Sequence, residues 1–158
     1  MKKQFAMIGL LVVMTMIAAG TAANAQSLQY KLTAKIPFEF TVANKKLPAG
    51  EYSVRRAQQT SGDLVLQIDS KDGRESISRL TIPVNTLEPA NESRLVFHRY
   101  GDEYFLFEIW PAGGNTGREL PKSRSERAAE QKFRESVVGM ANVKAPRAEI
   151  VTVVASMQ

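Results

Sequence analysis

Apolar and polar residues alternate over several short segments of the chain, which is the pattern of half-buried β-strands. The apolar positions are Phe38, Phe40 and Val42; Tyr52 and Val54; Leu64, Leu66 and Ile68; Leu80, Ile82 and Val84; and the β-branched run Ala148–Ala155. Turn-forming runs such as Leu47–Gly50 and Ser70–Gly73 separate these segments. Ile77 is out of phase with the apolar residues that follow it, which predicts a bulge or bend near Ser78 and Arg79.

The clearest unit is a hairpin over Arg94–Trp110 with Gly101 and Asp102 at its tip. Glycine at the first central position suits a type II′ turn. With that loop, Tyr100 faces Glu103, His98 faces Phe105 and Val96 faces Phe107. One face of the hairpin then carries Val96, His98, Phe105, Phe107 and Ile109, and the other carries Leu95, Phe97, Tyr104, Leu106, Glu108 and Trp110. Both faces are largely apolar, so we expect each of them to be covered.

One helix is predicted over residues 123–138, where the period of two is lost. Ser123 and Glu126 fit a capping box at its start. An apolar stripe recurs every four residues at Ala129, Phe133 and Val137. Because this stripe is narrow, the helix needs a surface to pack on. We expect that surface to be the hairpin face with Phe97, Leu106 and Trp110.

Together these elements predict one β-rich domain over residues 26–158, with about seven strands and one C-terminal helix. Short strands and frequent turns favour an all-β fold, either an antiparallel β-sandwich or a partly open barrel.

The N-terminus has the order of a secretory signal peptide over residues 1–25. Lys2 and Lys3 precede an apolar run, Phe5–Gly20, and the small residues Ala23–Ala25 provide a cleavage site. An uncleaved membrane anchor is the alternative, and after cleavage no transmembrane anchor is expected. The chain has no cysteine, so neither a disulfide nor a lipid-modified cysteine is available. We therefore expect an exported protein, periplasmic or extracellular.

The formal charge is +5 and falls to +3 when Lys2 and Lys3 are removed. Such a small excess, in an exported protein, does not favour nucleic acid as a partner. The densest basic stretch, Lys122–Arg134, is interleaved with glutamates and is typical of a solvated helix face.

Candidate chemistry is sparse. With one histidine and no cysteine, a zinc or copper site is not expected, and neither is any cofactor. Asp69–Gly73 lacks the ligand spacing of a calcium loop and favours a hairpin turn. No G-x-S-x-G sequence is present, and His98 is predicted to be a strand residue. Glu103 and Glu108 are predicted to lie on opposite faces of a strand, so no catalytic residue is assigned.

A glycine-rich loop, Gly113–Gly117, offers one binding hypothesis, since backbone N–H groups before a helix can bind an anion. Asn115 would contribute from the loop, Arg118 and Lys122 would add positive charge, and Trp110 would adjoin as a flat surface. The alternative is that the loop only connects a strand to the helix and that Trp110 is a core residue.

The segment Leu47–Val54 is similar to the turn-into-strand signature of prealbumin-like and carboxypeptidase-regulatory-like β-sandwich modules. More widely, residues 36–54, 95–102 and 113–123 resemble a group of uncharacterised exported bacterial proteins. The resemblance implies a β-sandwich-like exported domain, and it implies no activity and no site residues.

The sequence therefore favours an exported, non-enzymatic binding or envelope-associated module, whose partner would be an envelope component, a protein or a glycan. The alternative is a small secreted hydrolase or carbohydrate-active protein. An enzyme would show a pocket where titratable groups converge, whereas a binding module would show an exposed aromatic or basic patch.

Overall fold

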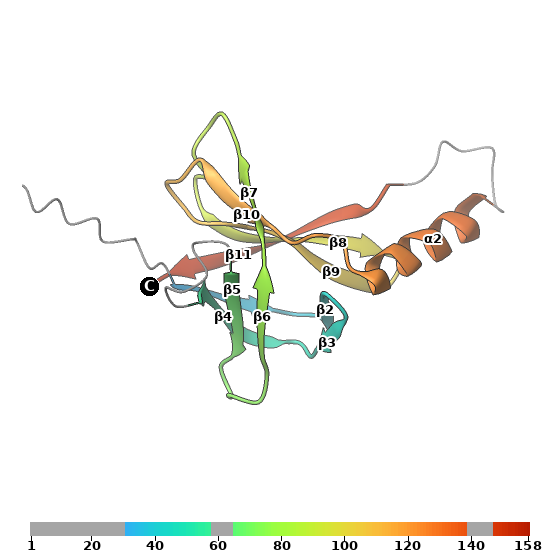
Figure 1. The fold of residues 1–158 in the computed structure, drawn as a ribbon, viewed down its shortest axis with the longest axis horizontal. Coiled ribbons are helices and arrows are strands. Elements are labelled where there is room, and N and C mark those ends of the chain that lie inside the picture. The colour runs from blue at the N-terminus through green and yellow to red at the C-terminus, as the bar shows by residue number, and fades with distance from the viewer. Residues whose placement is uncertain (1–30, 58–64, 139–146) are drawn as a thin grey trace, which may run out of the picture.

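The computed structural model describes residues 31–57, 65–138 and 147–158 (Figure 1). The predicted signal peptide, residues 1–25, lies outside them. All described strands belong to one hydrogen-bonded sheet of eleven strands. They are β1 (Lys31–Ile36), β2 (Phe40–Val42), β3 (Lys45–Leu47), β4 (Gly50–Arg56), β5 (Val65–Ser70), β6 (Ser76–Leu80), β7 (Ile82–Asn85), β8 (Ser93–Tyr100), β9 (Glu103–Trp110), β10 (Thr116–Glu119) and β11 (Glu149–Met157). The described helix is α2 (Arg124–Val138), and no helix of the described part is long and apolar enough to cross a membrane.

The sheet curls into a partly open barrel, so the predicted all-β class is confirmed. Its main path runs β3-β2-β9-β8-β11-β1-β4-β5-β6. The chain passes from β6 into β7 across one residue, Thr81, and β7 pairs with β10, which returns to β9. In Figure 1, β5 and β6 stand steeply across β8, β9 and β11, and β6 continues upward into β7. The barrel is thus closed on one side through the bent β6–β7 segment.

On the other side the barrel wall has a gap. Among the described strands, β6 and β3 end the main path and do not pair with each other. An ion pair between Lys45 of β3 and Glu75, just before β6, bridges one end of this gap. The β7–β10 pairing closes the other end. We call the gap between β6 and the β2–β3 hairpin the seam.

The barrel interior is filled by one apolar cluster that includes Leu32, Phe40, Tyr52, Leu66, Phe97 and Ile109. The rings of Phe40 and Phe97 meet edge to face, with their centroids 5.6 Å apart. Side chains therefore fill the interior, as in other small barrels.

The predicted hairpin is confirmed, with Gly101 at φ 63° as its turn requires. Its register differs from the expected one beyond Phe97, because Val96 pairs with Glu108 and Phe107 is the extra residue of a β-bulge. Because of this extra residue, the residues of β9 after Phe107 point to the face opposite to the expected one. Ile109 therefore lies in the interior cluster, whereas Trp110 packs outside with Val96.

The predicted helix is also confirmed, but its expected packing surface is wrong. Ala129 and Phe133 pack against Tyr100 and Phe105, on the outer face of the hairpin tip. Phe97 belongs to the interior cluster, and Trp110 belongs to a separate cluster on the outside of the sheet. Figure 1 shows α2 beyond the end of β8 and β9, away from β7 and β10. Trp110 lies at the β7–β10 end, since its ring is against Gly117 of β10. The helix covers one end of the outer face and not the whole of it.

Candidate functional site

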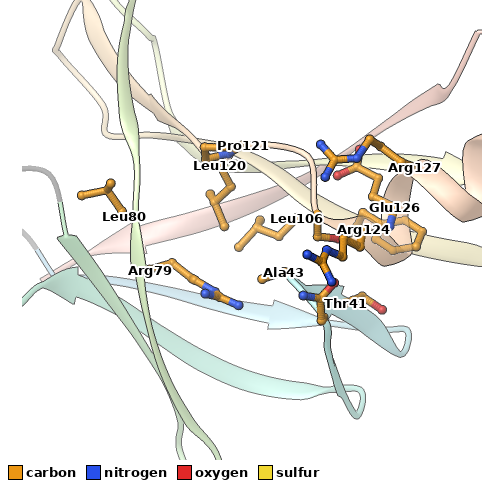
Figure 2. A pocket seen from close by; sticks show the side chains of 13 residues that line it. Thr41, Ala43, Arg79, Leu80, Leu106, Leu120, Pro121, Arg124, Glu126 and Arg127 are labelled. Atoms are coloured by element: carbon orange, nitrogen blue, oxygen red, sulfur yellow. Dashed lines mark hydrogen bonds between the residues drawn. The ribbon is translucent and has the colours of Figure 1, made fainter.

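A pocket of about 340 Å³ opens in the seam (Figure 2). Strand β6 supplies Arg79 and Leu80 on one side, and β2 and its turn supply Thr41, Ala43 and Asn44 on the other. The rest of the lining comes from β9, from the segment after β10 and from the start of α2: Phe105, Leu106, Leu120, Pro121, Ser123, Arg124, Glu126 and Arg127. We call this the seam pocket. It lies where the sheet is open, so its wall includes a strand edge, a turn and the start of the helix.

Three arginines line the pocket, and we call them the pocket arginines: Arg79, Arg124 and Arg127. The Nε atom of Arg79 is buried and has no hydrogen-bond partner among the described residues. Arg124 and Arg127 are exposed. Figure 2 shows the Arg79 side chain reaching from β6 toward Ala43, with Arg124 extending from the helix start on the other side. A buried N–H without a partner costs free energy, so a ligand that accepts from Arg79 would be favoured there.

The only carboxylate in the lining is Glu126, and it is already engaged. Its Oε1 atom lies 2.7 Å from His98 Nδ1, and the Tyr100 hydroxyl donates to it at 3.5 Å. Both His98 and Glu126 are buried. The His98 ring also stacks on Phe107, with the centroids 3.9 Å apart. Glu126 therefore holds the helix to the hairpin and leaves the pocket arginines without a carboxylate partner in the lining.

The helix start is fixed by hydrogen bonds from two directions. Ser123 Oγ accepts from the backbone N–H of Glu126 at 3.1 Å, so Ser123 is the predicted N-cap. The Glu126 side chain does not return to complete the capping box, because His98 binds it. Ser125 joins the helix to the β2–β3 turn, where its Oγ donates to Ala43 O at 2.8 Å and its N–H donates to Asn44 Oδ1 at 3.2 Å. These bonds set the positions of Arg124 and Arg127 at the pocket.

The N-terminal amides of the helix are thus largely used by the protein itself, so the pocket's positive character comes from side chains. Opposite these side chains lie apolar ones. Leu106 and Leu120 are buried at 3% and 5% exposure, whereas Leu80 is 62% exposed. In Figure 2, Leu106 and Leu120 lie close together, whereas the Leu80 side chain extends from β6 away from them. The pocket lining therefore combines arginines with the edge of the apolar core.

Lys122, one of the predicted binding residues, lies outside the pocket lining in a hydrogen-bonded network under the helix. Its Nζ atom donates to Glu130 Oε2 at 2.7 Å and to the Tyr100 hydroxyl at 3.1 Å. Burial opposes the charged amine, but these two hydrogen bonds outweigh burial and raise the pKa of Lys122. The bond from Lys122, with added attraction from Arg134, lowers the pKa of Glu130. Burial raises the pKa of the Tyr100 hydroxyl.

Trp110 and Arg118 lie on opposite faces of the sheet. Trp110 is 7% exposed, and its ring lies against Gly117 of β10. The next residue, Arg118, therefore points the other way, on the side of Leu120. Arg118 is buried, at 7% exposure.

Asn115 is exposed, and its side-chain amide donates to Thr86 O and Leu87 O at 3.5 and 3.4 Å. Strand β10 separates the glycine-rich loop from the helix, so the loop does not open the helix directly. The structure thus does not bring together the four residues proposed from the sequence, and a binding role for each of them stays a prediction.

Glu103 and Glu108 were expected on opposite faces, and this expectation is wrong because the bulge at Phe107 lies between them. They fall on one face, but about 16 Å of strand separates them, too far to flank one bond. Glu108 Oε2 instead accepts from Trp110 Nε1 at 2.8 Å. The Asp69–Gly73 segment forms the predicted hairpin turn, with Gly73 at φ 73°. Within residues 31–57, 65–138 and 147–158, no group of three or more histidines, cysteines or carboxylates is placed to hold a metal ion.

The pocket arginines were missed from the sequence, although each left a signal. Arg79 is two residues from the inward-facing Ile77, so strand alternation directs it inward as well. Arg124 and Arg127 belong to the basic stretch that the sequence favoured as a solvated face. No family model, curated protein or solved structure matches the chain.

Proposed function

We propose that the protein is an exported, non-enzymatic binding module that takes a ligand with an anionic group in the seam pocket. The observation that carries this proposal is the buried Arg79 Nε atom, which has no partner among the described residues and lines the same pocket as two further arginines. A guanidinium presents several N–H donors in a planar fork, which suits a carboxylate, sulfate or phosphate.

Binding is favoured over hydrolysis because the candidate base and nucleophile near the pocket are already hydrogen-bonded to other residues. A nucleophile needs a base within hydrogen-bond reach. The one histidine, His98, is paired with Glu126. The Ser123 hydroxyl is occupied by the helix cap and by Ser125 Oγ at 2.9 Å. These contacts support a structural role for both residues.

Export is part of the proposal and rests on the signal-peptide pattern of residues 1–25. The mature chain would then begin at Gln26 and work in the periplasm or outside the cell. An envelope component, protein or glycan, would have to present an anionic group to be a partner. N-terminal sequencing of protein from the envelope fraction tests the export step, and a chain that still starts at Met1 in a membrane pellet would contradict it.

The binding step is tested by following side-chain Nε–H signals of arginine by NMR during titration with sulfate and benzoate at constant ionic strength. We expect a saturable shift of the Arg79 signal. Arg74 is an internal control, because it is exposed and its Nε lies 3.5 Å from Asp72 Oδ2. Shifts of equal size at Arg74 and Arg79 would show unspecific ion binding and would refute the proposal.

Variants locate the site. The double variant Arg124→Gln/Arg127→Gln should weaken benzoate binding about tenfold, since hydrogen bonds to charged groups contribute about 1.5–3 kcal/mol when desolvated and less at exposed positions. Lys132→Gln removes one charge from an exposed position of the same helix outside the pocket lining and should leave affinity unchanged. Equal effects per charge removed would mean that only the overall charge matters.

A further inference from the structure

We infer that the partner at the seam pocket is an extended peptide segment of another protein, which adds as a strand to the free edge of β6 and places an acidic side chain at Arg79. This inference rests on the proposed function and names the class of partner for the same site. A small dissolved anion and a second copy of this chain are the other occupants, and the test below distinguishes them from a peptide.

The hydrogen-bond pattern of β6 shows which of its backbone groups face the seam. The Glu75 C=O accepts from a β5 N–H at 2.8 Å. Hydrogen-bonded pairs in an antiparallel ladder recur at every second residue, so Ile77 and Arg79 direct their N–H and C=O groups to β5. Those of Ser78 and Leu80 therefore point to the other edge, into the seam. Among the described strands, none pairs with this edge of β6.

Strand β10 shows that the same edge accepts a strand farther along. The Thr86 N–H donates to Asn115 O at 2.9 Å, so by the same alternation Ile82 and Val84 direct their backbone groups to β10. Ile82 is two residues from Leu80, and Figure 1 shows β6 continuing into β7, so β10 lies on the edge that is free at Leu80. The last residue of β10 pairs with Ile82. A peptide antiparallel to β6 would occupy the line that β10 leaves.

The pocket side chains specify an acidic residue in this peptide. Directly opposed residues of neighbouring strands point to the same face, so the peptide residue opposite Arg79 would point inward, to the buried Arg79 Nε. Arg124 and Arg127 line the same pocket, and its one carboxylate, Glu126, is bound to His98. A glutamate there would accept from Arg79, whereas an apolar residue would leave the Nε–H buried without a partner. The edge thus selects acidic strands over apolar ones.

The positions beside the acidic residue favour apolar side chains. Figure 2 shows Leu80 extending from β6 to the side opposite Arg79, and Leu80 is 62% exposed. A peptide residue opposite Leu80 would lie beside it on the outer face and cover part of it. The ion pair of Lys45 with Glu75 bridges the seam at the other end of β6, which limits pairing to the Ser78–Leu80 end. The expected core of the peptide is therefore an acidic residue between two apolar, β-branched ones.

The test uses the full mature chain and the probe acetyl-Thr-Val-Glu-Val-Thr-amide, followed by NMR. We expect a saturable slowing of amide hydrogen exchange at Ser78 and Leu80. Ile77 and Arg79 are internal controls and should change little, because their N–H groups already bond to β5. The same peptide with glutamine in place of glutamate should bind about tenfold more weakly, because hydrogen bonds between charged groups are roughly twice as strong as neutral ones.

Two methylated peptides separate strand addition from charge attraction. In antiparallel pairing, the two valines would lie opposite Ser78 and Leu80 and direct their N–H groups to β6, whereas the glutamate opposite Arg79 would direct its N–H away from β6. N-methylation of a valine should weaken binding about tenfold or more, because it removes a hydrogen bond and adds a methyl group against the strand. N-methylation of the glutamate should have a much smaller effect. Equal effects of the two methylations would refute strand addition.

A charge variant and a competing small anion complete the test. Arg124→Gln/Arg127→Gln should weaken the glutamate peptide more than the glutamine peptide, and equal weakening would contradict the acidic contact. If benzoate binds at the pocket arginines but the peptide protects neither Ser78 nor Leu80, the inference is refuted and anion binding stands. If neither benzoate nor the peptide binds, both are refuted. Protection of Ser78 and Leu80 that grows with protein concentration alone would assign the edge to a second copy and overturn the inference.

Discussion

The contact between Trp110 and Gly117 leads to a quantitative prediction, because it leaves no room for a side chain at position 117. A Cβ atom built on Gly117 would lie 2.6, 2.7 and 2.8 Å from three carbons of the Trp110 ring. The φ angle of Gly117 is not in the left-handed region. Gly117→Ala therefore tests packing alone and not backbone conformation.

The indole ring cannot easily move to relieve this overlap. Its Nε1 donates to Glu108, the Arg94 guanidinium lies 5.7 Å from the ring centroid, and Val96 packs beside it. Position 117 is held between β7 and β9 through the pairing of β10. We expect Gly117→Ala to lower the free energy of unfolding by about 1–3 kcal/mol, the usual cost of overpacking. For a chain of this length this corresponds to roughly 2–4 °C in Tm per kcal/mol.

The assay is urea unfolding followed by tryptophan fluorescence, which reports on Trp110 because the chain has one tryptophan. Gly114→Ala is the matched control, since its Cβ would meet its nearest neighbour at 3.9 Å, and it should change stability by less than about 0.5 kcal/mol. In a Trp110→Ala background, followed by circular dichroism, the cost of Gly117→Ala should vanish. A cost that persists without the ring would refute the packing argument.

Three further changes test other parts of the structure. Phe133→Ala should lower the free energy of unfolding by about 1.5–2.5 kcal/mol in urea, about half of the cost at a fully buried site, because Phe133 is only half-buried against Tyr100. Glu130→Gln should flatten the loss of stability at acid pH, measured as Tm against pH. Because the pKa of Glu130 is lowered in the folded state, its ionised carboxylate stabilises the fold, and this stabilisation is complete above the unfolded pKa, about 4.5. It is lost as the pH falls through the folded pKa. EDTA should leave the Tm unchanged, and a drop that calcium reverses would reveal a structural metal.

Local sequence patterns were sufficient for the hairpin, the helix and the last strand, because each depends on neighbouring residues. The sequence pattern underestimated the number of strands: about seven were predicted, and the described residues form eleven. Strand β1 carries the same alternation, with Leu32, Ala34 and Ile36 buried, and was overlooked. Strands β3 and β10 have three and four residues, too short to show a period.

The bend between β6 and β7 shows how tertiary context overrides the pattern. The sequence placed Leu80, Ile82 and Val84 on a core face and a bend near Ser78 and Arg79. Instead, Ile77 faces the core, Leu80 and Ile82 are exposed, and the break falls at Thr81. The chain leaves one pairing partner, β5, for another, β10, at this point. Such a change of partner depends on segments distant in sequence, so local periodicity cannot predict it.

The open seam explains why the candidate site escaped sequence analysis and why its residues have the chemistry they have. The free edge of β6 is a place where another strand could add, and proteins protect such edges with inward-pointing charges and ion pairs. Arg79 points inward from that edge, and Lys45 and Glu75 bridge its beginning. The side chain that protects the edge thereby brings an unsatisfied guanidinium N–H into the barrel wall. Glu126 could have neutralised it, but His98 and Tyr100 hold that carboxylate at the helix. Edge protection and helix docking together leave positive charge in the seam pocket, and this charge supports the proposal that the seam binds an anion.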